Sequence, residues 1–217
     1  MSNTERPADG RRLGAAVPLL FLLYPILVDT AVATHKPAYA FAAMCVLALI
    51  TLPGYAARLG NWLWLLSVGW IALSYLVCFE SNGLYLLYLP PPLICLVMMA
   101  FFGRTLRAGS EPLITRISRA MRGGVISEEV RTYTRKVTIL WVTMFGLLAL
   151  ESSLLAIFAP PRIWSLFTNL IDYLIIASVL TVEFFYHTRR YPNPRQRNFS
   201  DFAREMVRID FRKLLFD

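Results

Sequence analysis

The chain has 217 residues, of which 57% are hydrophobic and 17% are charged. With a mean hydropathy of +0.53, this composition excludes an ordinary soluble domain, whose surface must face water. The net charge of +8 would suggest nucleic acid for a soluble protein, but here the placement of the basic residues predicts a lipid partner and no nucleic acid.

Apolar runs along the chain predict an all-α fold, an integral membrane helical bundle of about six transmembrane helices. Six spans of about 20 residues would take roughly 120 positions, which leaves no room for a separate catalytic domain of ordinary size. The second run is short and reaches full length only if Pro53, Gly54 and Tyr55 lie at its end. The runs are Leu13–Thr34, Ala38–Leu52, Trp62–Phe79, Leu84–Phe102, Val137–Phe158 and Trp164–Tyr186.

Basic residues fall almost entirely on one side of these spans. If the N-terminus is cytoplasmic, 20 of the 22 lysines and arginines are inside, and only Lys36 and Arg162 are outside. Positive residues concentrate on the cytoplasmic side of membrane proteins, so both termini are predicted in the cytoplasm. The predicted segments are a cytoplasmic start (1–12), four spans (13–103), a basic loop (104–136), two spans (137–187) and a basic tail (188–217).

The first span also has features of a signal peptide. Arg11 and Arg12 precede the apolar run, and the triplet Ala31-Val32-Ala33 has the spacing of a cleavage site. The run is long for a signal peptide and contains Pro18 and Pro25, which favours an uncleaved anchor.

Three consecutive prolines, Pro90, Pro91 and Pro92, stand within the fourth span. Because proline lacks an N–H group, the helix is expected to bend or break there. Such a break can line a cavity, or it can be a kink that only improves packing.

The loop is expected to carry amphipathic surface helices. Ser110, with Glu111 and Pro112, looks like a helix start, and Gly123-Gly124 looks like its end. One face would be apolar and the rest basic, which is typical of a helix lying flat on anionic lipid. Ser127 is expected to start another helix that continues into the fifth span. The apolar face comprises Leu113, Ile114, Ile117 and Met121, and the basic positions are Arg116, Arg119 and Arg122.

The tail is predicted to form a second amphipathic helix capped by Ser200, with Phe202, Met206 and Ile209 along its apolar stripe. Contact with the membrane surface is the leading interpretation. An acidic soluble protein such as an acyl carrier protein would use the same positive surface.

Acidic residues inside spans are costly and mark functional candidates. Glu151 and Asp172 could line a polar cavity that passes protons or grips a head group; alternatively, they could only hydrogen-bond Ser152, Thr168 or Asn169, or pair with Arg162. Asn169, Asp172 and Glu183 share one predicted helix face with Ile176 and Val179. The candidates for an intramembrane polar path are Glu151, Asp172, Asn169, Glu183 and Asp29.

The sequence contains no glycine-rich phosphate loop, zinc-binding HExxH motif or nucleophile elbow. His35 and His187 fall on opposite faces of the predicted topology, so they cannot share a metal or a catalytic site. Cys45, Cys78 and Cys95 lie in separate apolar runs and suggest neither disulfides nor a metal cage. No catalytic residue, metal or cofactor is therefore predicted.

A family resemblance rests on Phe102-Gly103-Arg104-Thr105-Leu106, Gly109, the segment 111–116 and Tyr133-Thr134-Arg135. With these motifs the chain resembles a family of proteobacterial inner-membrane proteins encoded beside fatty-acid-synthase-like enzymes of aryl polyene or xanthomonadin pigment clusters. The resemblance implies a role in making, handing over or exporting an acyl-chain lipid. It also implies cytoplasmic-face positions, which together with the loop give the docking candidates Arg104, Thr105, Arg116, Arg119 and Arg135.

Three functional hypotheses follow. The first is a non-enzymatic accessory protein that anchors or organises acyl-lipid or aryl-polyene synthesis at the cytoplasmic face, docking an acyl carrier protein or a related enzyme on its basic surface. The second is a small proton-coupled transporter or lipid flippase that uses the intramembrane acids. The third is an integral-membrane acyl-lipid enzyme, which is disfavoured because no pair of nucleophile and base is visible.

Overall fold

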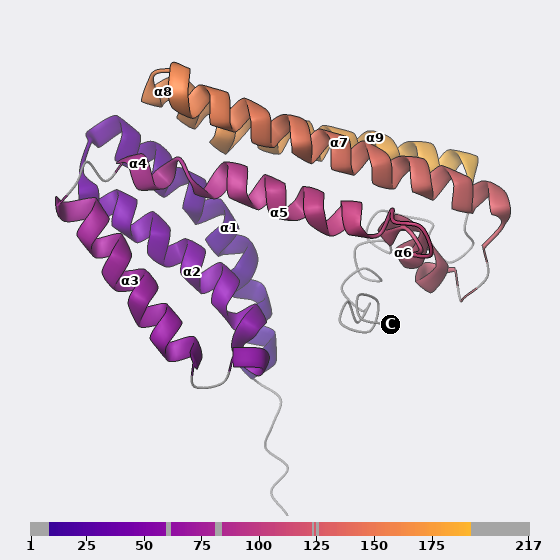
Figure 1. Cartoon of the computed structure of the whole chain (residues 1–217), viewed down its shortest axis with the longest axis horizontal. Coiled ribbons are helices and arrows are strands. Elements are labelled where there is room, and N and C mark those ends of the chain that lie inside the picture. The colour runs from indigo at the N-terminus through magenta and orange to yellow at the C-terminus, as the bar shows by residue number, and fades with distance from the viewer. Residues whose placement is uncertain (1–8, 60–61, 81–83, 123, 125, 192–217) are drawn as a thin grey trace, which may run out of the picture. The chain divides into compact units, whose positions relative to one another are not determined.

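The computed structural model describes residues 9–59, 62–80, 84–122, 124 and 126–191, and every regular element in these ranges is helical (Figure 1). The chain divides into two compact units, the first comprising Met1–Pro91 with Ser152–Tyr173 and the second Pro92–Glu151 with Leu174–Asp217. The helices are α1 (Asp9–Thr34), α2 (Pro37–Leu59), α3 (Trp62–Glu80), α4 (Leu84–Leu87), α5 (Pro90–Arg104), α6 (Leu113–Met121), α7 (Glu128–Phe158), α8 (Pro161–Leu166), the π-helix η1 (Phe167–Ile171) and α9 (Asp172–Arg190).

Within the described residues, three helical segments are long and apolar enough to cross a membrane. They are Tyr85–Arg104, Glu128–Phe158 and Pro161–Arg190, of 20, 31 and 30 residues. Three shorter apolar stretches, Leu22–Thr34, Pro37–Ile50 and Leu65–Phe79, fall below that length. The described residues thus form an all-helical structure with three helical segments of span length, where the sequence predicted about six.

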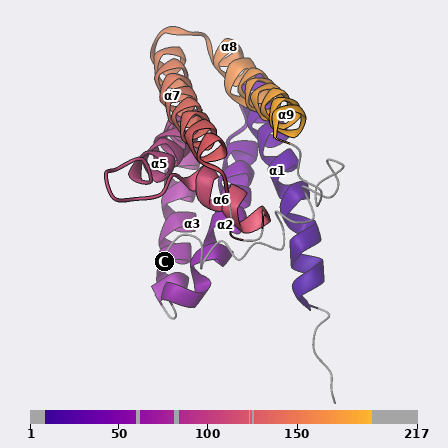
Figure 2. The same ribbon diagram turned by 90° about the vertical axis from the view of Figure 1, so that its right-hand side faces the viewer.

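In the first unit, α1 packs along α2, and α2 packs along α3 (Figure 1 and Figure 2). Only His35 and Lys36 connect α1 to α2. His35 takes a left-handed conformation with φ of 55°, as helix-ending residues often do, and Pro37 supplies a preorganised first helical residue. The apolar core of this unit includes Val28, Met44 and Trp164, which are fully buried.

The triplet that resembled a cleavage site lies inside α1. Ala31 and Val32 are buried in the core of the first unit. This part of α1 therefore belongs to the packed core of the first unit.

The predicted break at the three prolines is confirmed. α4 ends at Leu87, a turn follows over Tyr88 and Leu89, and α5 begins at Pro90. Proline at the first position of a helix loses no intrahelical hydrogen bond, because that N–H would have no partner in any case. The three prolines therefore start a helix instead of bending one.

In the second unit, the apolar face of α6 packs inside the protein. Leu113, Ile117 and Met121 are buried, and Phe101 and Phe102 of α5 pack against them. The expectation that this face lies on lipid is therefore wrong. The helix is amphipathic as predicted, but α5 covers its apolar side.

The start of α6 also differs from the expectation. Its N-cap residue is Pro112, so Ser110 does not cap the helix and Glu111 lies before its first turn. Instead, the Leu113 N–H donates to the Thr105 Oγ1 at 3.0 Å. A threonine from the preceding turn thus satisfies one of the N–H groups that the helix start leaves without an intrahelical partner.

Both helix boundaries that follow α6 agree with the sequence. Gly124 has φ of +99°, and its N–H donates to the Arg119 carbonyl at 2.9 Å, which ends the helix with a glycine in the left-handed region. Ser127 precedes α7, and its Oγ accepts from the Val130 N–H at 3.4 Å. The predicted amphipathic tail, including Ser200, Phe202, Met206 and Ile209, lies outside the described residues.

Candidate functional site

Four arginines surround one hollow in the second unit, with a volume of about 400 Å³. They come from three segments: Arg107 from the turn after α5, Arg119 from α6, and Arg131 with Arg135 from the first turns of α7. We call this the basic hollow.

The turn that closes the basic hollow depends on a glycine. Gly109 has φ of +84°, a conformation that costs glycine little and other residues more. The Ser110 N–H donates to the Arg107 carbonyl at 3.1 Å, which tightens the turn. The chain is thereby folded back so that Arg107 and Glu111 both line the basic hollow.

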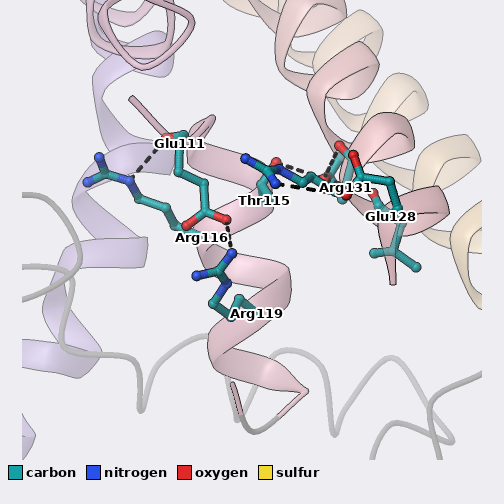
Figure 3. A network of polar contacts seen from close by, with 8 residues as sticks. Glu111, Thr115, Arg116, Arg119, Glu128 and Arg131 are labelled. Atoms are coloured by element: carbon teal, nitrogen blue, oxygen red, sulfur yellow. Dashed lines mark hydrogen bonds and ion pairs between the residues drawn. The ribbon is translucent and has the colours of Figure 1, made fainter. Parts of the chain in front are cut away.

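The charges of the basic hollow are only partly compensated. An Arg119 nitrogen lies 2.6 Å from a Glu111 carboxylate oxygen (Figure 3). Arg131 lies 3.8 Å from Glu128, an exposed pair of small energetic value. Arg107 and Arg135 form no ion pair with the described part of the chain. The basic hollow therefore has an excess of positive charge that suits an anionic ligand.

Only some of the predicted docking residues line the basic hollow. Arg119 and Arg135 line the basic hollow. Arg116 does not, because its Nε donates to the Glu111 carbonyl at 3.0 Å (Figure 3). Thr105 is occupied in capping α6. Arg104 is exposed at the end of α5 and does not line the basic hollow.

Two lining arginines, Arg107 and Arg131, were missed by the sequence analysis. Arg131 and Arg135 are four residues apart, a spacing that places them on one helix face, and this signal could have found Arg131. Nothing in the sequence places Arg107 at the same hollow, because its position there depends on the turn at Gly109.

A second group of polar side chains lies in the first unit. The Asn169 Nδ2 donates to the Ser165 Oγ at 3.1 Å, and the Ser165 Oγ donates to the Asp29 Oδ1 at 3.2 Å. Ser165 is buried, Asn169 is half-buried and Asp29 is exposed. These three residues, the polar chain, link α1 to the start of the last long helical segment.

Asn169 lies within the π-helix η1, and Asp172 is the first residue after it. A π-turn inserts one residue into the helical repeat, so the three- and four-residue spacing of the predicted stripe is interrupted. Asp172 is buried in the first unit, and Arg162 forms no ion pair with it among the described residues. Ser165, which the sequence analysis did not select, is the residue that joins Asp29 to Asn169.

The other two predicted acids lie in the second unit. The Tyr133 hydroxyl hydrogen-bonds the Glu183 carboxyl, and the rings of Tyr186, His187 and Tyr191 gather around Tyr133 at centroid distances of 5.5, 5.9 and 5.3 Å. Both Glu151 carboxyl oxygens are buried and have no hydrogen-bond partner in the described part of the chain. Glu151 and Glu183 thus belong to the second unit, whereas Asp29, Asn169 and Asp172 belong to the first.

Across the described ranges, no three His, Cys, Asp or Glu side chains are placed to hold a metal ion. No protein-family model matches the sequence, and neither a curated protein nor a solved structure does. The basic hollow and the polar chain are two features of the described residues from which a function can be inferred.

Proposed function

We propose that this chain is a multi-pass inner-membrane protein of six spans, with both termini in the cytoplasm, that docks an acidic partner on its cytoplasmic face. Its helices support a membrane location because they expose large apolar side chains, which are tolerated where lipid replaces water. Phe158, Ile157 and Val182 are 79, 73 and 68% exposed. The three shorter apolar helices of the first unit supply the remaining spans.

The basic hollow is the observation that supports docking. Its arginines come from separate segments, so the fold holds them together as a preformed site. Arginine presents several N–H donors in a planar fork that matches phosphate and carboxylate groups. A partner that carries phosphate or a cluster of carboxylates has the complementary chemistry.

The family resemblance gives the class of partner. An acyl carrier protein has an acidic surface and a phosphate-bearing prosthetic arm, and both suit the basic hollow. The chain would then anchor or organise acyl-chain synthesis at the membrane. Anionic lipid remains the neighbour of the same cytoplasmic face.

Reversing the charge of Arg131 and Arg135 together is expected to weaken capture of phosphopantetheinylated acyl carrier protein at least tenfold, since like charges then face each other across the contact. Binding is measured with the purified full chain in mild detergent at low ionic strength. Lys136→Glu is the control for the single variants Arg131→Glu and Arg135→Glu, because it reverses one charge beside Arg135 at a residue that does not line the basic hollow.

An equal loss of acyl carrier protein binding in Lys136→Glu would show that only the overall charge matters, and it would contradict a docking site. Retention of binding in the double variant would contradict it as well. Binding of the wild type to anionic vesicles but to no acyl carrier protein would replace the proposed partner with lipid.

The polar chain favours a second candidate, a small proton-coupled transporter. Hydrogen-bonded polar residues in apolar helices mark ion pathways, and π-turns occur often at functional sites. Asp29→Asn should then abolish proton flux in liposomes containing the purified chain and a pH-sensitive dye. Thr34→Val on the same helix, whose hydroxyl donates to the Thr30 carbonyl at 2.7 Å, should leave the flux unchanged. Equal fluxes in wild type and Asp29→Asn would eliminate this candidate.

A further inference from the structure

The second unit contains a cavity of about 430 Å³ that is distinct from the basic hollow. Helices α5, α6, α7 and α9 all contribute to its lining. Its volume is in the range of small-molecule binding sites. The walls are mostly apolar and aromatic, and they include Phe101, Phe102, Ile117, Trp141, Phe145 and Leu180. We call it the aromatic cavity.

Polar groups are few in the aromatic cavity, and one of them has no partner. Ser118 is 7% exposed, and its Oγ is buried without a hydrogen-bond partner among the described residues. Burial of a hydroxyl is unfavourable unless something bonds it. A ligand with an acceptor atom would satisfy this hydroxyl.

Arg122 brings a positive charge to the same cavity. One of its terminal nitrogens donates to the Tyr191 carbonyl at 2.9 Å, which leaves most of the five guanidinium N–H groups for a ligand. Partial burial lowers the pKa of Arg122 from its ordinary value, but an arginine in a protein keeps its proton. The half-buried cation is therefore best stabilised by an anion.

The remaining charged group of the aromatic cavity does not fill that role. Glu183 also lines it, but its carboxyl is hydrogen-bonded by the Tyr133 hydroxyl. Glu183 and Arg122 form no ion pair in the described structure. The cationic group thus remains available at a site whose other walls are apolar.

We propose that the aromatic cavity binds an acyl chain with an acidic head group, the chain against the aromatic walls and the head group on Arg122 and Ser118. A neutral apolar molecule would leave the guanidinium without an anion, and a small inorganic anion would leave the apolar walls uncovered. The inference does not depend on docking, because the basic hollow uses other residues. A variant that loses acyl-chain binding but keeps partner docking, or the reverse, distinguishes the two proposals.

The test uses a palmitic acid analogue with a diazirine in its chain, photolysed with the purified full chain in detergent. Labelled peptides are expected to include those of Phe101, Phe102 and Trp141. Leu180→Trp fills the aromatic cavity and should reduce labelling at least tenfold. Leu174→Trp is the matched control: Leu174 lies on the same helix, is 56% exposed and does not line the aromatic cavity. Leu180→Phe, a smaller change, replaces Leu180→Trp if that variant does not fold.

Competition identifies the head group and its source. Palmitate should displace the probe, whereas hexadecanol, which has the same chain without the acid, should be at least tenfold weaker. Arg122→Gln should remove this preference, and Arg122→Lys should restore part of it, because charge-assisted hydrogen bonds are the stronger kind. Displacement by phosphatidylglycerol in preference to palmitate would support the proposal with a membrane phospholipid as the source.

Three results would overturn the proposal. The first is labelling that Leu180→Trp and Leu174→Trp reduce equally. The second is displacement by hexadecanol as strong as that by palmitate. The third is labelling that appears only in a chain ended at Tyr191, which would mean that the protein's own C-terminal segment occupies the aromatic cavity.

Discussion

Replacing Trp164 with alanine is expected to lower the free energy of unfolding by about 3–5 kcal/mol, the usual cost of emptying a large buried site. The ring is fully buried in the core of the first unit and meets the Tyr88 ring edge-on at a centroid distance of 4.6 Å. The loss of packing applies even where the surrounding solvent is lipid, because helices in membranes associate through close van der Waals contact. Unfolding by sodium dodecyl sulfate in mixed micelles measures the effect.

Two other substitutions separate packing from hydrogen bonding. The Trp164 Nε1 has no hydrogen-bond partner among the described residues, so Trp164→Phe removes an unpaired buried group that costs about 1–3 kcal/mol and should be less than half as destabilising as alanine. Trp70 is 37% exposed and donates to the Met44 carbonyl at 3.3 Å; Trp70→Ala should cost about 1 kcal/mol, mainly the hydrogen bond. Equal decreases in the free energy of unfolding for Trp164→Ala and Trp70→Ala would contradict the role of Trp164 as a core residue.

The second prediction concerns topology and is expected to be all-or-none. In a chain whose three native cysteines are replaced by alanine, Arg162→Cys and Lys36→Cys should react with a membrane-impermeant maleimide in intact spheroplasts. Arg107→Cys should react only after the membrane is permeabilised. The reason is the positive-inside distribution of the basic residues. Lys36 and Arg162 are exposed at helix ends and Arg107 is exposed in a turn, so all three sites are open to the reagent from their own side.

Labelling of Arg107→Cys in intact spheroplasts would reverse the assignment of the loop to the cytoplasm. Labelling of Lys36→Cys with none of Arg162→Cys would mean an odd number of spans between them. The latter outcome would lower the number of spans below six. The short helices of the first unit would then be the first whose assignment as spans is withdrawn.

Sequence patterns predicted the features that depend on neighbouring residues. The break before Pro90, the glycine-terminated end of α6 at Gly124 and the start of α7 after Ser127 all follow from local backbone chemistry. The capping of α6 by Thr105 does not, because the donor and acceptor are eight residues apart and meet through a turn. The period of α6 predicted an apolar face, but periodicity carries no information on what covers that face.

The candidate sites also combine features that local spacing predicts with contacts between residues far apart in the sequence. Four-residue spacing is visible in the sequence, so Ser165 with Asn169 and Arg131 with Arg135 could be paired without a structure. The contact of Ser165 with Asp29 spans 136 positions, and the contribution of Arg107 needs the turn at Gly109. The π-helix could not be anticipated, because an inserted residue changes hydrophobic periodicity too little to be read from one sequence.

The two-residue connection between α1 and α2 bears on how the protein is made. Closing a loop costs conformational entropy that grows with its length, and at His35 and Lys36 that cost is close to its minimum. Contacts between neighbouring segments also form faster than contacts between distant ones. The first two helices can therefore pair as soon as both have left the ribosome, whereas Trp164, which completes their core, arrives only after more than a hundred further residues have been synthesised.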